Sequence, residues 1–216
     1  MLVNIGAAFR PLLAITLLLF GLALPAADAA PRILALGDSL TAGFGLSREQ
    51  AFPVRLQARL AAQGVATTVI NGGVSGDTTA DGLARLDWAL ADHPDIVLVE
   101  LGANDALRGI DPKLTYANLD KVVARLKASG ARVMLLGMLA PANWGRDYQR
   151  DFDAIYPKLA EKYQVPLYPF FLEGVATDPA LNQPDGLHPN AQGVEIIADK
   201  IAPYVARLIA AAGASG

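Results

Sequence analysis

The stretch LALGDSLTAGFG, residues 34–45, decides how the rest of the chain is interpreted. The largely apolar run 32–36 predicts a short buried strand, which breaks at Gly37 and is followed at once by Asp38 and Ser39. Serine and aspartate commonly cap the helix that follows such a strand. A serine in this place can equally be a nucleophile held at the carboxyl edge of a sheet. Both interpretations fit the stretch itself, so the rest of the sequence has to decide between them.

Residues 1–29 have the features of a secretory signal peptide in their usual order. A segment with one cation, Arg10, precedes an uncharged apolar run over 11–24, and small residues lead to an A-x-A site ending at Ala29. The apolar run has 14 residues, fewer than the roughly 20 that a membrane span needs. We expect cleavage after Ala29 and export to the periplasm, with secretion as the alternative. A retained anchor is the other interpretation of this segment. After cleavage we expect no stable membrane insertion.

The composition of the chain excludes several classes of function. The net charge is −3 and there is no run of lysine or arginine, so nothing supports nucleic-acid binding. The absence of cysteine excludes disulfides, thiolate metal sites and a cysteine nucleophile. With two histidines far apart we expect no metal site. No G-x-G-x-x-G follows the first strand, and we expect no cofactor.

Apolar segments alternate with segments of helical length along residues 30–216. Segments such as 96–101 are almost wholly apolar, which is typical of strands covered on both faces. The predicted strands are 32–37, 67–71, 96–101, 132–138 and 165–171, and the predicted helices are 48–63, 78–92, 112–129, 147–163 and 191–211. This alternation implies right-handed crossovers and a parallel sheet. We expect one α/β domain over 30–216, a three-layer α/β/α, flavodoxin-like, doubly wound sheet of about five parallel strands.

Polar and glycine-rich loops follow the predicted strands, at the rim where doubly wound folds bind their ligands. Each loop alone consists of ordinary turn residues. Together they predict one functional site, made of the segments GDSL (37–40), GGVSGDT (72–78), GAND (102–105), PANWG (141–145) and DGLHPN (185–190).

The two histidines of the chain have different expected positions. His93 lies between a predicted helix and a strand at the opposite rim, where a surface role is expected. His188 follows Asp185 by three residues on the candidate rim. A serine nucleophile needs a nearby base, and that base needs a partner that fixes its tautomer. His188 and Asp185 supply both groups. A local turn hydrogen bond is the alternative role for this pair.

These segments, taken in order, resemble the GDSL family of SGNH hydrolases, in the branch of bacterial acyl-CoA thioesterases, lysophospholipases and arylesterases. The resemblance extends from Ile33 to the final helix. It rests on GDSL (37–40), SGDT (75–78), VELGAND (99–105), LRG (107–109), PANWGR (141–146) and DGLHPN (185–190).

The resemblance implies catalytic roles for five residues. Ser39 is the expected nucleophile, His188 the general base and Asp185 the residue that orients the imidazole. The oxyanion hole is expected from the backbone N–H groups of Ser39 and Gly76 and the side-chain amide of Asn104. Glycine suits position 76 because a side chain there would stand between the N–H and the substrate. We expect structural roles, without metal, for the remaining acids of these loops, which are Asp38, Asp77 and Asp105.

The expected activity is hydrolysis of carboxylic esters and thioesters: aryl and acyl esters, acyl-CoA and lysophospholipids. The alternatives are a carbohydrate O-acetyl esterase of the same fold and, further off, a non-catalytic binding module. Apolar side chains of the same loops are the candidate acyl pocket: Leu107, Ile110, Leu139, Pro141 and Trp144. The expected partner is a small acyl substrate, and we expect the chain to be a monomer.

Overall fold

The computed structural model describes Met1 and residues 30–213. Apart from Met1, the predicted signal peptide of residues 1–29 lies outside the described residues.

Five parallel strands form one sheet in the order β2-β1-β3-β4-β5. The strands are β1 (Arg32–Gly37), β2 (Thr68–Gly73), β3 (Ile96–Glu100), β4 (Arg132–Leu136) and β5 (Leu167–Tyr168). Every residue of β3 is buried, and in β1 only Arg32 is exposed. The unbroken apolar runs therefore belong to strands covered on both faces, which confirms the predicted fold class.

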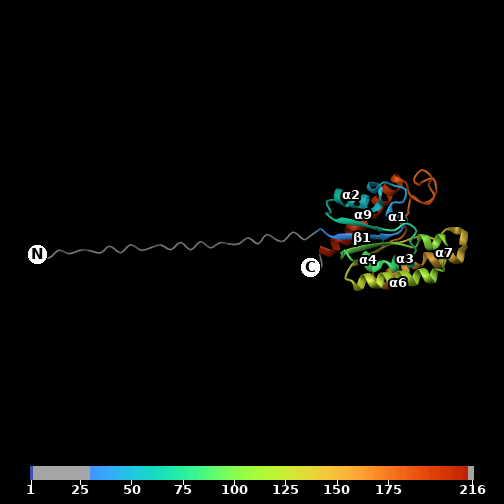
Figure 1. Cartoon of the computed structure of the whole chain (residues 1–216), viewed down its shortest axis with the longest axis horizontal. Helices are drawn as coiled ribbons and strands as arrows, with labels where there is room; N and C mark the ends of the chain where they lie inside the picture. The colour runs from blue at the N-terminus through green and yellow to red at the C-terminus, as the bar shows by residue number, and fades with distance from the viewer. Residues whose placement is uncertain (2–29, 214–216) are drawn as a thin grey trace.

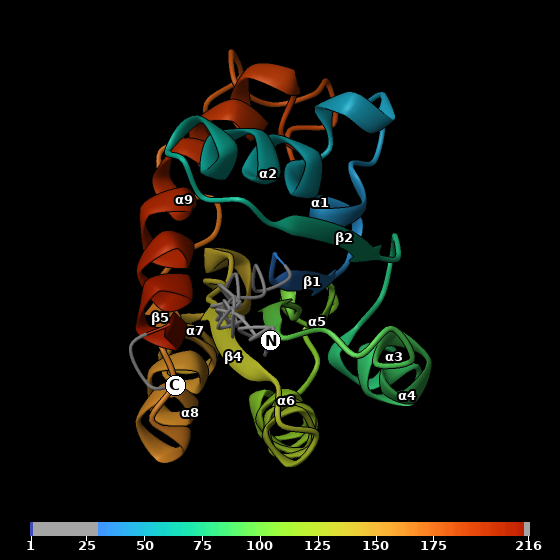
Figure 2. The same cartoon turned by 90° about the vertical axis from the view of Figure 1, so that its left-hand side faces the viewer.

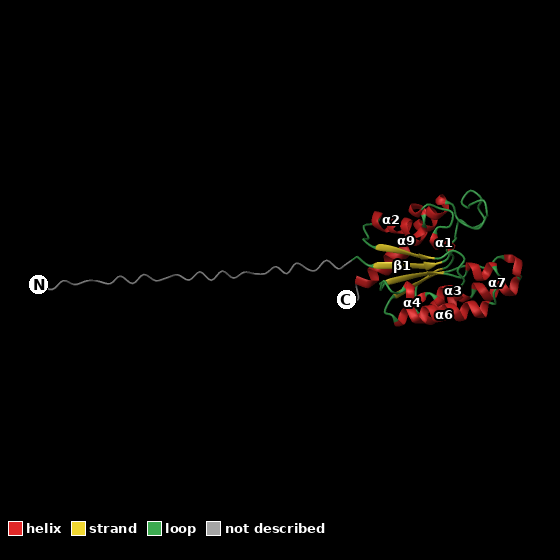
Figure 3. Ribbon diagram, viewed as in Figure 1, coloured by secondary structure: helices red, strands yellow, loops and turns green. Residues whose placement is uncertain are grey.

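Helices cover both faces of the sheet, so that the strands lie between two helical layers (Figure 1, Figure 3). On one face α2 packs against α9, and on the other α6 packs against α3 and α8 (Figure 2). The α-helices are α1 (Ser39–Ala42), α2 (Phe52–Ala62), α3 (Thr79–Ala84), α4 (Leu86–Ala89), α5 (Ala103–Leu107), α6 (Pro112–Ala128), α7 (Arg146–Asp153), α8 (Ile155–Tyr163) and α9 (Ala191–Gly213). Two short 3₁₀ helices are η1 (Arg48–Gln50) and η2 (Ala142–Trp144). None of the described helices is both long and apolar enough to cross a membrane.

Prolines account for two differences from the predicted elements. The strand predicted over 165–171 is limited to Leu167–Tyr168. Pro166 before it has no N–H for the ladder, and after it the next backbone N–H that donates to β4 or its extension is that of Phe171, to Gly137 O at 2.8 Å. The helix predicted over 147–163 is divided into α7 and α8. Pro157, in the first turn of α8, cannot donate to the carbonyl four residues earlier and crowds it, which interrupts the helix there.

Two other predicted helices are also divided. The segment 78–92 contains α3 and α4, which meet at Arg85, and the segment 48–63 contains η1 and α2. These changes leave the connections between strands as predicted. The loops that follow β1, β2 and β3 therefore meet at one rim of the sheet, as the parallel topology requires.

Candidate active site

The loop that follows β1, residues 37–45, is called here the Ser39 loop. Ser39 is the first residue of α1, and Asp38 caps that helix by accepting a hydrogen bond from Leu40 N at 3.0 Å. Gly37 lies beside β3 in the sheet, and a Cβ at this position would come within 2.7 Å of the carbonyl oxygen of Glu100. Ser39 thus lies directly at the carboxyl end of a central strand. The residue that caps α1 is its neighbour Asp38.

Ser39, His188 and Asp185 form a continuous hydrogen-bonded chain. His188 Nε2 lies 2.9 Å from Ser39 Oγ, and His188 Nδ1 lies 2.7 Å from Asp185 Oδ2. The other carboxylate oxygen of Asp185 accepts hydrogen bonds from His188 N at 3.0 Å and Leu187 N at 2.9 Å. These two backbone bonds, followed by the bond to the imidazole, lower the pKa of Asp185 to about 2. An ionised Asp185 favours the tautomer with hydrogen on Nδ1, which leaves Nε2 to accept the Ser39 proton.

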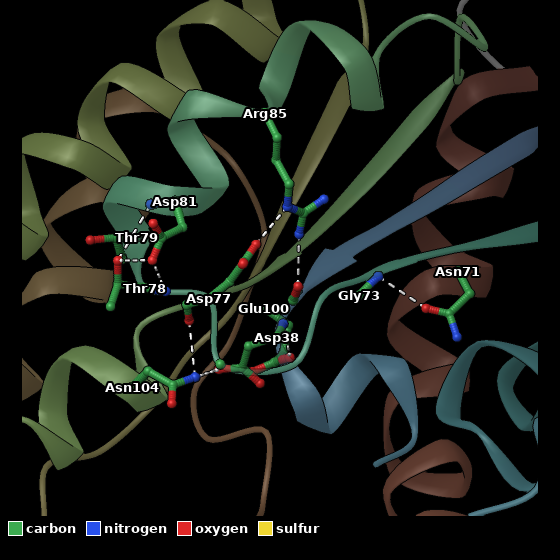
Figure 4. A network of polar contacts seen from close by, with 12 residues as sticks. Asp38, Asn71, Gly73, Asp77, Thr78, Thr79, Asp81, Arg85, Glu100 and Asn104 are labelled. Atoms are coloured by element: carbon green, nitrogen blue, oxygen red, sulfur yellow. Dashed lines mark hydrogen bonds and ion pairs between the residues drawn. The ribbon is translucent and has the colours of Figure 1, made fainter.

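The three predicted oxyanion donors lie at the ends of neighbouring strands, but they differ in what they bind. Within the part of the chain that the structure describes, neither Ser39 N–H nor Gly76 N–H donates to a protein acceptor. Gly76 has φ +89°, a conformation that strains other residues. The Asn104 amide, in contrast, donates to Asp38 Oδ2 at 3.1 Å and to Asp77 O at 2.9 Å (Figure 4). Two donors are therefore free, and the third is held in place by the loops after β1 and β2.

The remaining acids of these loops take part in buried networks, as predicted from the sequence. Asp38 is fully buried, and burial is the main reason that its pKa rises to about 6. Asp77 accepts from Arg85 Nε at 2.5 Å (Figure 4), and the same guanidinium donates to Gly37 O at 2.9 Å. Asp105 accepts from the backbone and the hydroxyl of Thr79 at 2.8 and 2.6 Å. Each network links two of the loops at the rim.

Glu100, the last residue of β3, is a buried acid that sequence reasoning missed. Its Oε2 accepts from Asp38 N at 3.3 Å and Thr41 Oγ1 at 2.8 Å, whereas its Oε1 has no hydrogen-bond partner among the described residues. Burial, reinforced by the charge of Asp38, raises the pKa of Glu100 well above its ordinary value. The only sequence signal was an acid at the end of an otherwise apolar strand.

A cavity of about 430 Å³ opens beside Ser39 and His188. Of the five predicted pocket residues, Leu107, Leu139 and Pro141 line it. Ile110 and Trp144 do not, and Trp144 Nε1 instead donates at 2.8 Å to Ala106 O, which lies within α5. The full lining is Ser39, Leu40, Ala103, Asn104, Ala106, Leu107, Met138, Leu139, Ala140, Pro141, Phe170, Leu172, Ala176, Thr177, Asn182, Gly186, Leu187 and His188.

The residues of this lining that sequence reasoning missed come mainly from the segments after β4 and β5, such as Met138, Phe170 and Leu172. In the sequence, the apolar residues of these segments could not be distinguished from ordinary core residues. His93 precedes β3 and thus lies at the opposite end of the sheet from Ser39, as predicted. Among the described residues, no three histidine, aspartate or glutamate side chains gather as a metal site would require.

Comparisons with known proteins agree with this geometry. The model of the GDSL-like lipase/acylhydrolase family matches residues 35–196. An arylesterase of Vibrio mimicus is 47% identical over 87% of this chain and 94% of its own length. Thioesterase 1/protease 1/lysophospholipase L1 of Escherichia coli K12 is 42% identical over 96% of this chain and 98% of its own. The crystal structure of AlinE4, an SGNH-hydrolase family esterase, superposes with a TM-score of 0.71 at 46% identity, covering 83% of this chain and 97% of that one. The chain therefore belongs to the GDSL-like lipase/acylhydrolase family and is a hydrolase of the SGNH type.

Proposed function

We propose that this enzyme hydrolyses esters and thioesters through an acyl-enzyme intermediate on Ser39. The observation that carries the proposal is the hydrogen-bonded chain from Ser39 Oγ through His188 to Asp185, beside an apolar cavity. This arrangement supplies a nucleophile, a base and a group that fixes the tautomer of the base.

In the acylation step, Ser39 Oγ attacks the substrate carbonyl carbon while His188 Nε2 accepts the serine proton. The imidazolium that forms is stabilised by the ionised Asp185. The C–O or C–S bond then breaks, and His188 returns the proton to the departing alkoxide or thiolate. In deacylation a water molecule takes the place of the leaving group, and the same proton transfers release a carboxylic acid and free Ser39.

The oxyanion of each tetrahedral intermediate would be bound by Ser39 N–H and Gly76 N–H, which have no competing acceptor among the described residues. Asn104 joins them by exchanging its hydrogen bond to Asp77 O for one to the oxyanion. Its second bond, to Asp38 Oδ2, keeps the amide in place during this exchange.

The substrates we propose carry an apolar acyl group. The cavity beside Ser39 is lined mostly by apolar side chains, and three of them, Leu107, Leu139 and Leu187, remain exposed. The names of the relatives, an arylesterase and a thioesterase/lysophospholipase, support aryl esters, acyl thioesters and lysophospholipids as the classes to test.

A fluorophosphonate probe and a substrate panel test these proposals. The probe is expected to label the wild type and Ser129→Ala, a matched serine variant remote from the site, but not Ser39→Ala. Labelling that persists in Ser39→Ala would overturn the assignment of the nucleophile. The panel contains nitrophenyl esters of rising chain length, acyl-CoAs, lysophospholipids and acetylated sugars. Activity confined to acetylated sugars would replace the acyl-ester proposal by the O-acetyl esterase alternative.

We further propose that the enzyme is exported, on the strength of the signal-like features of residues 1–29. We also propose that it is a monomer. Mass spectrometry of the protein from a periplasmic extract of the expressing bacterium is expected to find a chain that begins at Ala30. A full-length chain confined to the membrane fraction would show a retained anchor. Light scattering of the purified protein tests the monomer.

A further inference from the structure

His188 is carried by a long segment without regular structure. The segment between β5 and α9 contains no helix or strand, apart from one isolated bridge between Asn182 and Pro189. Ser39 and His188 are separated by 149 residues in the sequence. Their 2.9 Å contact therefore depends on how this segment docks on the Ser39 loop.

Gln183 connects the segment that carries His188 to the Ser39 loop. Its side-chain Nε2 donates to Phe44 O of the Ser39 loop at 2.7 Å and to Pro189 O at 3.0 Å. Its backbone N–H donates to His188 O at 2.7 Å, and its carbonyl accepts from Gly186 N at 2.9 Å. The residues 183–189, called here the His188 loop, are thus closed on themselves by the backbone of Gln183 and tied to the Ser39 loop by its amide.

The Ser39 loop is shaped to receive this side chain. Gly45 has φ +74°, and a Cβ there would lie 2.1 Å from Gln183 Oε1. The backbone conformation therefore favours glycine, and a side chain at this position would displace the amide of Gln183. Next to it, the Phe44 ring lies 4.7 Å from the imidazole of His188, centroid to centroid. Phe44 thus receives the amide of Gln183 on its carbonyl and contacts His188 with its ring.

We propose that Gln183 is a positioning residue that holds His188 Nε2 within hydrogen-bond distance of Ser39 Oγ by docking the His188 loop on the Ser39 loop. The inference rests on the proposed function of Ser39 and His188. Asp185 lies inside the His188 loop and moves with His188, so their mutual hydrogen bond does not depend on Gln183. Losing the docking contact changes the distance from the base to the nucleophile and leaves the base and its partner together.

The test is the variant Gln183→Met, which keeps the length of the side chain but donates no hydrogen bond. Displacing a catalytic group by about 1 Å costs up to about 100-fold in rate, so we expect kcat to fall by about 10- to 100-fold. KM is expected to stay within about threefold, because Gln183 does not line the cavity. The rate of fluorophosphonate labelling of Ser39 should fall in parallel with kcat. The matched control is Gln164→Met, in which another side-chain to backbone hydrogen bond is lost at the end of α8, and it should keep both rates.

Normalising kcat to the number of active sites that the probe labels distinguishes a role of Gln183 in positioning His188 from a role in stabilising the fold. If Gln183 only stabilised its own loop, the folded variant would retain its kcat while its melting temperature fell. A kcat for Gln183→Met within twofold of the wild type would therefore overturn the proposal. Should this variant not fold, Gln183→Asn keeps the amide but shortens it by one methylene, and the same loss of kcat is expected. Failure of the proposed function appears separately, as a wild-type enzyme that the probe does not label.

Discussion

Replacing Glu100 by glutamine should remove a pH dependence from the stability of the enzyme. Glu100 is 1% exposed, and its carboxyl accepts hydrogen bonds from Asp38 N and Thr41 Oγ1 beneath Ser39. Because burial and the neighbouring charge of Asp38 raise its pKa, Glu100 retains its proton in the folded state at pH values where the unfolded chain has lost it. Glu100→Gln keeps the shape and the accepting oxygen but has no proton to lose.

The sign and the size of the effect follow from proton linkage. The ordinary pKa of Glu100 is 4.5, so above that value the folded state binds one proton more than the unfolded state. The free energy of unfolding of the wild type then falls by up to about 1.4 kcal/mol per pH unit as the pH rises. From about pH 5 to about pH 8 the fall continues until the folded state also loses the Glu100 proton, and each such pH unit is a noticeable part of a typical stability of about 5–15 kcal/mol. Asp38, whose pKa of about 6 is due chiefly to burial, adds its own pH dependence to the stability of both the wild type and Glu100→Gln.

Urea unfolding followed by circular dichroism, at several values across this pH range, measures the effect. The stability of Glu100→Gln relative to the wild type should rise steadily with pH. Any fixed cost of burying the amide shifts the whole curve without changing this slope. Glu161→Gln, on the exposed surface of α8, is the matched control and should run parallel to the wild type. Parallel curves for the wild type and Glu100→Gln would refute the assignment of a retained proton.

Three further substitutions test the site. Asn104→Ala removes one oxyanion donor and should lower kcat by about 100- to 1,000-fold with little change in KM, measured on a nitrophenyl ester. Asp185→Asn no longer favours the productive tautomer of His188 and should lower kcat by about 10,000-fold while the circular dichroism spectrum is unchanged. Gly37→Ala places a Cβ 2.7 Å from Glu100 O and should lower the stability to urea by about 1–3 kcal/mol; an unchanged unfolding midpoint would contradict the close packing of β1 on β3.

Much of the fold and of the site could be predicted from local sequence pattern. Continuous apolar runs identify strands buried on both faces, and parallel strands bring their carboxyl ends to one rim. This is why the loops that contain Ser39, Gly76 and Asn104 could be assigned to one rim, and the resemblance to the GDSL family then implied the roles of these three residues. The pairing of Asp185 with His188 was also predictable, because three residues of chain already keep the two side chains close.

Other features required the tertiary structure because their partners are distant in the sequence. The roles of Glu100 and Gln183 depend on contacts with the Ser39 loop, 62 and 139 residues away. The cavity lining from the segments after β4 and β5 consists of apolar side chains that resemble core residues until the cavity is seen. Trp144 is the opposite case, because it was expected in the cavity but instead donates its indole N–H to Ala106 O in α5.

The sequence by itself determined the layers of the fold, the rim that carries the chemistry and the residue types present there, because hydrophobic periodicity and turn chemistry act over a few neighbouring residues. Only the tertiary structure decided which of the predicted donors lack an acceptor among the described residues, which acid is buried at the end of β3, and which residue connects the loops of His188 and Ser39. These properties depend on burial and on hydrogen bonds between loops, and both arise only when distant segments pack together. The serine of LALGDSLTAGFG lies at the end of a strand because of local sequence, and it lies 2.9 Å from His188 Nε2 where two loops, distant in the sequence, meet at Gln183.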